Sequence, residues 1–203
     1  PLARRLVGLF TRLELPALDV QAALTAGSAV VLGQAADVVG TDAVPAGWAP
    51  DCPAAGPGLS QVRSTSPVQV SSGASPSVRR DTALGPGTFT SFGATSFDSM
   101  AARATMQASG TVVAAPVIVV PGSAAAGTCD ASNPANWGEP DRAAGMVSAC
   151  ARYFPVIYAP GDLHLAGGRG QGILLVRGDL DLSAGARFYG AVVVLGRITS
   201  SAG

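Results

Sequence analysis

The sequence predicts a mainly β fold: a single-chain parallel β-helix (β-solenoid) with about 17–18 residues per rung, one short helix and long loops. Three observations predict it: a strand–glycine–strand unit that occurs three times, a regular spacing between its glycines, and an apolar content of mostly small aliphatic residues. Hydrophobic residues make up 48% of the chain but aromatic residues only 5%, which suits narrow stacked layers better than a thick globular core.

The repeated unit is an apolar strand, a glycine corner and a second strand in which apolar and polar residues alternate. Its corner glycines are Gly161, Gly178 and Gly196, which lie 17 and 18 positions apart. Three strands of about five residues, each rising ~3.3 Å per residue, would make one rung of that length. Glycine suits such corners because it tolerates positive φ.

Stacked rungs place equivalent residues of successive units beside one another, at the ~4.8 Å spacing of neighbouring strands. The charged residues Asp162, Asp179 and Arg197 are expected in an outer ladder near the corners. Each rung would bury its apolar side against its neighbours. The apolar residues expected in this stacked core are Leu163, Leu165, Leu180, Leu182 and Ile198.

Three regions are predicted along the chain. Residues 1–40 contain a strand and the first solenoid coils, residues 41–110 are rich in loops, and residues 111–203 form the C-terminal solenoid. Short strands are expected, from alternation or from apolar runs, at 6–15, 29–32, 35–39, 68–70 and 77–78.

The loop-rich region is predicted to contain the one helix, at about residues 96–108, because apolar residues such as Phe97 and Met100 recur there at helical spacing. Thr95 or Ser96 is the expected N-cap, and Gly110 is expected to end the helix. Its expected role is to cover the end or the flank of the β structure.

Cysteine usage predicts one disulfide. Cys129 and Cys150 flank the polar excursion 130–149, and a cross-link there would remove loop-closure entropy worth roughly 3 kcal/mol. The alternative is that both are unpaired small hydrophobic residues. Cys52 is left over, either free or paired outside this sequence. Because there is no Cys-x-x-Cys spacing and His164 is the only histidine, the sequence assigns no metal site.

No acidic pattern points to catalysis. Asp162, Asp179 and Asp181 form the one acidic cluster worth testing, but a paired-carboxylate glycosidase needs two such groups across a groove. These aspartates instead recur at the repeat period, with arginines nearby, as solubilising corner residues do.

The remaining candidate motifs are also interpreted as structural, so no catalytic, cofactor-binding or metal-binding residue is assigned. His164 alternates with leucines and is expected to point outward. Gly167–Gly172 lacks the Lys and Ser/Thr of a phosphate loop and is expected to be a flexible corner. Ser60 and Ser66, like the other serines, have no nucleophile-elbow motif around them.

The charge content argues against a nucleic-acid partner. The chain has 13 basic residues, all of them arginine, and 13 acidic residues, with no basic stripe. So small a charged fraction favours a protein that packs against another protein. The longest apolar stretch, Val112–Val120, contains Pro116 and is about half of the ~20 residues a membrane span needs, so no transmembrane segment is predicted. With neither an initiator Met nor a signal peptide, the sequence is expected to be a piece of a longer chain.

Glycine-and-strand motifs cover most of the chain: Phe154–Tyr158, Gly161–Leu163, Gly170–Val176, Gly178–Leu182, Phe188–Val194, Gly40–Asp42, Gly47–Trp48 and Asn136–Gly138. Together they resemble the C-terminal region of PilX-like pilus-assembly proteins, and the repeat is similar to the polymer-forming β-helix of bactofilins. PilX-like proteins carry an N-terminal hydrophobic pilin helix, which is not among these motifs. The resemblance implies a bacterial envelope or exported protein, and it transfers no catalytic residue.

The expected function is that of a non-enzymatic structural or assembly protein in the periplasm or outside the cell, with pilus components or a membrane protein complex as partners. A second hypothesis is an accessory periplasmic subunit that docks on a larger membrane protein complex and stabilises it. A third is a carbohydrate-binding or carbohydrate-cleaving β-helix, which would need a groove lined with aromatic and acidic residues. The relevant aromatic residues are scattered: Trp48, Trp137, Tyr153, Tyr158 and Tyr189.

Overall fold

The computed structural model describes residues 22–26, 28–32, 40–41, 58–66, 68–70, 78–80, 84–114, 118–119, 128–140 and 149–200. The strands expected at 6–15 and 35–39, and Cys52, lie outside these residues.

Strands dominate the described residues, which confirms the prediction of a mainly β fold. The strands are β1 (Ala22–Ala26), β2 (Val30–Leu32), β3 (Ser60–Ser64), β4 (Val68–Val70), β5 (Val78–Arg80), β6 (Ser91–Phe92), β7 (Thr95–Ser96), β8 (Met106–Gln107), β9 (Gly110–Ala114), β10 (Ile118–Val119), β11 (Thr128–Cys129), β12 (Val156–Ala159), β13 (Leu163–Val176), β14 (Leu180–Ser183), β15 (Arg187–Val194) and β16 (Ile198–Ser200). The helices are α1 (Pro86–Thr90) and α2 (Phe97–Ala101).

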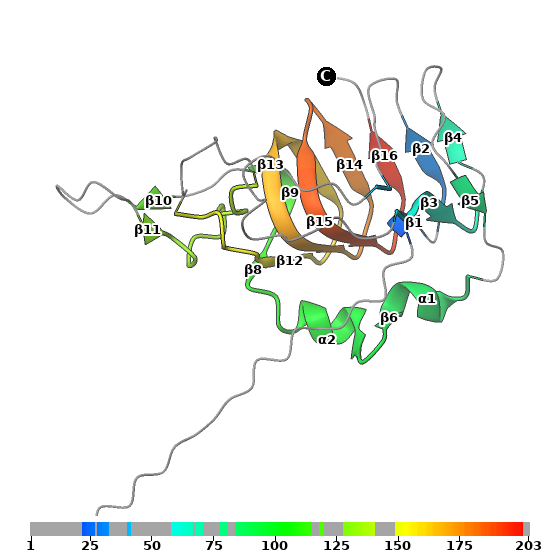
Figure 1. Ribbon diagram of the computed structural model, residues 1–203, viewed down its shortest axis with the longest axis horizontal. Coiled ribbons are helices and arrows are strands. Elements are labelled where there is room, and N and C mark those ends of the chain that lie inside the picture. Colours follow the sequence, from blue (N-terminus) through cyan, green and yellow to red (C-terminus); the bar gives the residue numbers. More distant parts are fainter. Residues whose placement is uncertain are drawn as a thin grey trace, which may run out of the picture.

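Twelve of the described strands belong to one sheet with parallel pairing, in the order β4-β2-β16-β14-β13-β15-β1-β3-β5 and with β8, β9 and β12 joined beside β13 (Figure 1). The long strand β13 belongs to two faces of this sheet, because Leu163–Ala166 pair with β14 and Arg169–Val176 pair with β15. We call the face with β8, β12, β15, β1, β3 and β5 the first face. The second face holds β9, β14, β16, β2 and β4.

The register of the second face follows the repeat seen in the sequence. Leu163 lies beside Leu180, and Leu180 lies beside Ile198. The row continues into the N-terminal part of the chain, because Ile198 also pairs with Val30 and Val30 with Val68. Two regions that are far apart in the sequence therefore share one row of the sheet.

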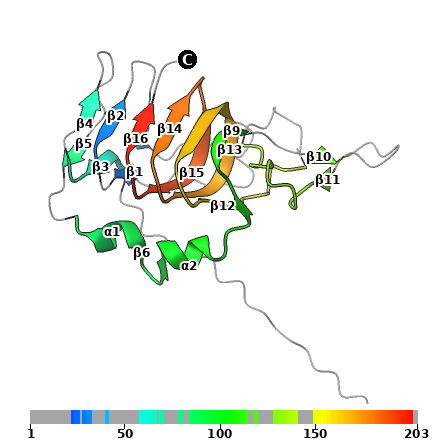
Figure 2. The ribbon, with the colours of Figure 1, turned by 180° about the vertical axis from the view of Figure 1, so that it is seen from behind.

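The main core lies between the two faces. The first face contributes apolar side chains such as Ile157, Leu174 and Val194, and the second contributes Leu163 and Ile198. All five are at most 2% exposed. A smaller apolar cluster lies outside the first face, where α2 covers the strands (Figure 2).

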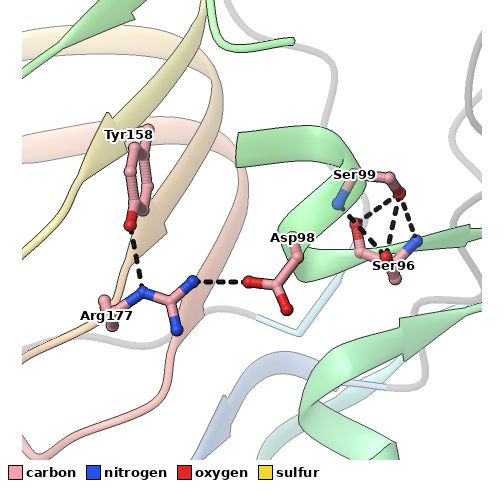
Figure 3. A network of polar contacts seen from close by, with 5 residues as sticks. All are labelled: Ser96, Asp98, Ser99, Tyr158 and Arg177. Carbon is pink, nitrogen blue, oxygen red and sulfur yellow. Dashed lines mark hydrogen bonds and ion pairs between the residues drawn. The ribbon is translucent and has the colours of Figure 1, made fainter. Parts of the chain in front are cut away.

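The predicted helix is shorter than expected. The prediction of about 96–108 is wrong at its C-terminal end, since α2 stops at Ala101. Ser96 is the N-cap, and its side chain and that of Ser99 exchange hydrogen bonds with each other's backbone N–H groups in a capping box (Figure 3). Beyond the helix, the backbone and side chain of Thr105 bond with Val156, which draws the chain onto β12 as strand β8. Strand pairing has outweighed helical propensity here.

A second helix, α1, corrects the expectation of a single helix. Its five residues, Pro86–Thr90, are too few to show a helical period in the sequence. Proline at the start of the helix is favourable, because its fixed φ suits the first turn and its missing N–H would have no partner there.

Gly167–Gly172, expected to be a flexible corner, lies within β13 and contains a corner at its first two residues. From Arg169 onwards the segment pairs in register with β15, so that Gly170 lies beside Phe188. Gly167 and Gly168 have φ of 101° and 79°, values that glycine adopts most readily, and there the strand turns from the second face towards the first.

Candidate functional site

The corner residues form a ladder that runs along the sheet. Asp162 Oδ1 accepts the backbone N–H of Asp179 at 2.8 Å, and Asp179 Oδ1 accepts the backbone N–H of Arg197 at 2.7 Å. The side chain of each corner thus satisfies a backbone donor of the next one. The sequence predicted this line of residues but not its hydrogen-bonding role.

The corner glycines serve this ladder by leaving space for it. A Cβ atom on Gly178 would lie 2.2 Å from Asp162 Oδ1, and one on Gly196 would lie 2.4 Å from Asp179 Oδ1. Gly161 has open space around its Cβ position. None of the three is among the glycines with positive φ, so the reason expected from the sequence is wrong: the requirement at Gly178 and Gly196 is steric.

A row of polar side chains lies on the outer side of the second face. Thr199 Oγ1 donates to Asp181 Oδ1 at 2.8 Å. His164 Nε2 lies 2.7 Å from Ser183 Oγ and 3.5 Å from Asp181 Oδ2, while its Nδ1 lies 3.4 Å from Thr111 Oγ1. His164 points outward as expected, with 39% of its side chain exposed.

This row differs from a nucleophile–histidine–carboxylate triad. In a triad the nucleophile and the carboxylate contact opposite nitrogens of the imidazole. Here Ser183 and Asp181 both lie at Nε2 of His164. In the described part of the chain, no group of three or more His, Cys, Asp or Glu side chains is arranged to hold a metal ion.

The row and the ladder border a shallow depression of about 440 Å³. Its charged lining consists of Asp162, Asp179, Asp181 and Arg197, and His164 lies among them. Because Asp162, Asp179 and Asp181 each accept a hydrogen bond from a neighbouring residue, the polar groups here are partnered largely with one another.

The second cluster of polar residues lies under a disulfide. Cys129 and Cys150 are joined, with their Cα atoms 4.9 Å apart. The buried Asn136 Nδ2 donates to the Asp130 carbonyl at 2.8 Å and lies 3.2 Å and 3.4 Å from the two sulfur atoms. Its Oδ1 accepts the Gly138 N–H at 3.0 Å. The disulfide and Asn136 together hold the two described ends of the excursion, residues 128–140 and 149–150, to each other.

Gln171 attaches this excursion to β13. Its buried Nε2 lies within hydrogen-bond distance of three carbonyl oxygens, those of Cys150, Ala151 and Tyr153, at 3.3, 3.2 and 2.7 Å. Its backbone N–H donates to the Trp137 carbonyl at 2.8 Å. Trp137 is fully buried, so it closes this end of the core.

Arg177 holds α2 against the first face. Its guanidinium donates to the Tyr158 hydroxyl at 3.0 Å and to the Asp98 carboxylate (Figure 3). It also lies over the Phe97 ring, 5.3 Å from the ring centroid. The pKa of Arg177 is raised, first by the hydrogen bond with Tyr158 and then by the one with Asp98. Sequence inspection missed this group because its members are distant in the chain and follow no period.

Comparisons with models of protein families, with curated proteins and with solved structures find no match to this chain. Among the described residues, no helix has the length and apolar character needed to span a membrane.

Proposed function

We propose that this chain is a non-enzymatic structural or assembly protein that works outside the cytoplasm, and that its stacked parallel strands form a β-solenoid. The observation that carries the proposal is the register of Leu163, Leu180 and Ile198, which come from three successive repeats and lie side by side. In such a stack each strand bonds to neighbours on both sides, which gives a stiff body with extended flat faces. Faces of this kind suit assembly with other proteins.

The state of the polar side chains supports a structural role. Asp162 and Asp179 bond to backbone N–H groups, and Asp181 bonds to Thr199. Catalytic carboxylates need to be free to exchange protons or to attack a substrate. These aspartates instead link neighbouring strands.

The disulfide supports a site of action in an oxidising compartment, the periplasm or the cell exterior. The test is to trap thiols in the source cells with an alkylating reagent before lysis. The proposal expects Cys129 and Cys150 to be protected until a reductant is added. Alkylation of both residues without reductant would refute the extracytoplasmic location. A Cys129→Ser variant is the matched control: its unpaired Cys150, which is buried in the folded protein, must be alkylated without reductant once the protein is denatured in the presence of the reagent.

The proposed partners are pilus components, in line with the PilX-like motifs of the sequence, or a membrane protein complex. Extraction of the native protein with a mild detergent, followed by mass spectrometry of what is recovered with it, separates these partners. Pilins or further copies of the chain would support the assembly protein. A fixed set of integral membrane proteins in constant ratio would identify an accessory subunit instead. Retention on a glycan column, or cleavage of a glycan, would favour the carbohydrate hypothesis.

A further inference from the structure

The sheet consists of two blocks that are each continuous in the sequence. We call β1–β5 (residues 22–80) the N block, and α2 with β8–β16 (residues 97–200) the C block. α2 belongs to the C block because it packs on Leu175 and because its Asp98 bonds to Arg177. The blocks meet where β1 pairs with β15 and β2 with β16, and we call this contact the joint.

The joint is apolar. Ala26 and Val30 of the N block meet Val194 and Ile198 of the C block, and all four are at most 1% exposed. Two register pairs connect β1 to β15, and three connect β16 to β2. Within the C block eight pairs connect β13 to β15 and four connect β13 to β14, while three connect β14 to β16. An open joint would expose apolar side chains and unpaired strand edges, and such edges readily pair with another chain.

The covalent connection between the blocks runs outside the joint. β5 lies at the end of the N block away from the joint, and β8 lies at the opposite end of the C block. The described part of the connection, with α1 and β6, runs along the side of the strands between these ends (Figures 1 and 2). Nothing in the described chain therefore ties β1 to β15 except strand pairing and packing.

We propose that the joint is an exchange interface and that its partner is a second copy of this chain. The edge formed by β15 and β16 offers the same hydrogen bonds and apolar contacts to any N block, whether from its own chain or from another. Residues 81–96 can span up to about 50 Å when α1 and the β6–β7 pair unfold and the segment is extended, which lets an N block reach a neighbouring C block. Reciprocal exchange gives a domain-swapped dimer, and its share rises with protein concentration because the exchange is bimolecular.

A disulfide across the joint tests this inference. Val31 and Thr199 are register partners, and both are partly exposed. Neighbouring strands lie ~4.8 Å apart, within the Cα separation of about 4.4–6.8 Å that a disulfide accepts. The variant is Val31→Cys with Thr199→Cys in a Cys52→Ser background. It is unfolded with its native disulfide intact, refolded at low and at high concentration, oxidised, and run on a denaturing gel without reductant.

The expected result is a cross-linked monomer after refolding at low concentration and a covalent dimer in increasing share at high concentration. The control pair, Asp181→Cys with Thr199→Cys, joins register partners inside the C block and should give cross-linked monomer at both concentrations. Cross-linked monomer alone from the joint pair at every concentration would overturn the exchange. An equal share of covalent dimer from the control pair would also overturn the exchange proposal, because dimer formation would then not depend on the joint.

A second measurement needs no cysteine substitution. Two forms of the full chain, one enlarged by a cleavable tag, are refolded together at high concentration and separated by size exclusion. A species that contains one tagged and one untagged chain, and that survives dilution until the protein is unfolded again, is expected. Only unmixed monomers would refute the exchange.

Discussion

The carboxylate of Asp162 accepts the backbone N–H of Asp179 at 2.8 Å, and a Cβ atom on Gly178, the residue between the two strands, would lie 2.2 Å from that carboxylate. Asp162 thereby requires glycine at position 178, next to the Asp179 whose backbone it bonds. The same arrangement recurs at Asp179 and Gly196. This contact explains the glycines at 178 and 196 but not the one at 161, whose Cβ position is open.

Gly178→Ala should lower the free energy of unfolding by about 1–3 kcal/mol, because the added methyl group overlaps Asp162 and the backbone of Gly161. Gly161→Ala is the matched control and should change it by less than ~0.5 kcal/mol, since its Cβ position is open. Urea unfolding of both variants measures the difference. Equal destabilisation of the two would contradict the steric explanation.

Asp179→Ala should lower the free energy of unfolding by about 1 kcal/mol, because the backbone N–H of Arg197 loses its acceptor. Asp179→Asn retains an oxygen acceptor and should lose less. Hydrogen exchange at the Arg197 amide reports the bond directly, and it should be faster in the Ala variant than in the Asn variant. Unchanged exchange in both would show that this hydrogen bond does not protect the amide.

Trp137→Ala should destabilise the protein by about 3–5 kcal/mol, because the indole is fully buried and packs edge to face on Phe188 with ring centroids 6.2 Å apart. The control is Phe154→Ala, since Phe154 is 51% exposed and its loss should cost less than ~0.5 kcal/mol. Thermal unfolding compares the two. A similar midpoint for both variants would refute the role of Trp137 in closing the core.

Cys129→Ser, made in a Cys52→Ser background, should lower the free energy of unfolding by about 2–4 kcal/mol through loss of the cross-link to Cys150. Adding a reductant to the Cys52→Ser protein should produce most of the same loss, whereas the double variant should not respond. If the reductant lowered the free energy of unfolding of the double variant by the same amount, the loss would not arise from the Cys129–Cys150 disulfide.

Asp130 should titrate below its ordinary value of 3.8, because the Ser132 side chain hydrogen-bonds to the carboxylate and lowers its pKa. A carboxyl pKa depressed by folding stabilises the folded state above the unfolded pKa, and this contribution is lost as the pH falls through the folded pKa. In Ser132→Ala the pKa should rise towards 3.8. NMR titration of the carboxyl carbon measures both values, and an unchanged pKa would exclude Ser132 as the cause.

Local features of the C-terminal repeat could be predicted from the sequence because they are periodic. The spacing that relates Leu163 to Leu180 and Ile198 is visible in the sequence, and these residues lie side by side in the sheet. The pairing of Val30 with Ile198 could not be predicted, since it joins distant segments with no shared period. The residue at which α2 ends could not be predicted from the sequence either, because it depends on the hydrogen bonds between Thr105 and Val156.

The polar site was predicted in its residues but not in its contacts. The sequence places Asp162, Asp179 and Arg197 in one line, yet it does not reveal that each aspartate accepts a backbone N–H from the next corner. The contacts of His164 with Ser183 and Thr111 depend on which strands become neighbours. Sheet neighbours are set by the tertiary fold and not by local propensity.

The position of β16 between β14 and β2 has a consequence for biosynthesis. Translation runs from residue 22 towards residue 200, so β1 and β2 can pair early with β3 and β4 but leave the ribosome long before their other neighbours, β15 and β16, exist. Pairing over such separations gives a high contact order and slow folding. In a nascent chain the sides of β1 and β2 that face β15 and β16 would therefore stay unpaired until the end of synthesis. Trimming residues 198–200 would open a gap in the middle of the sheet and would not shorten its edge.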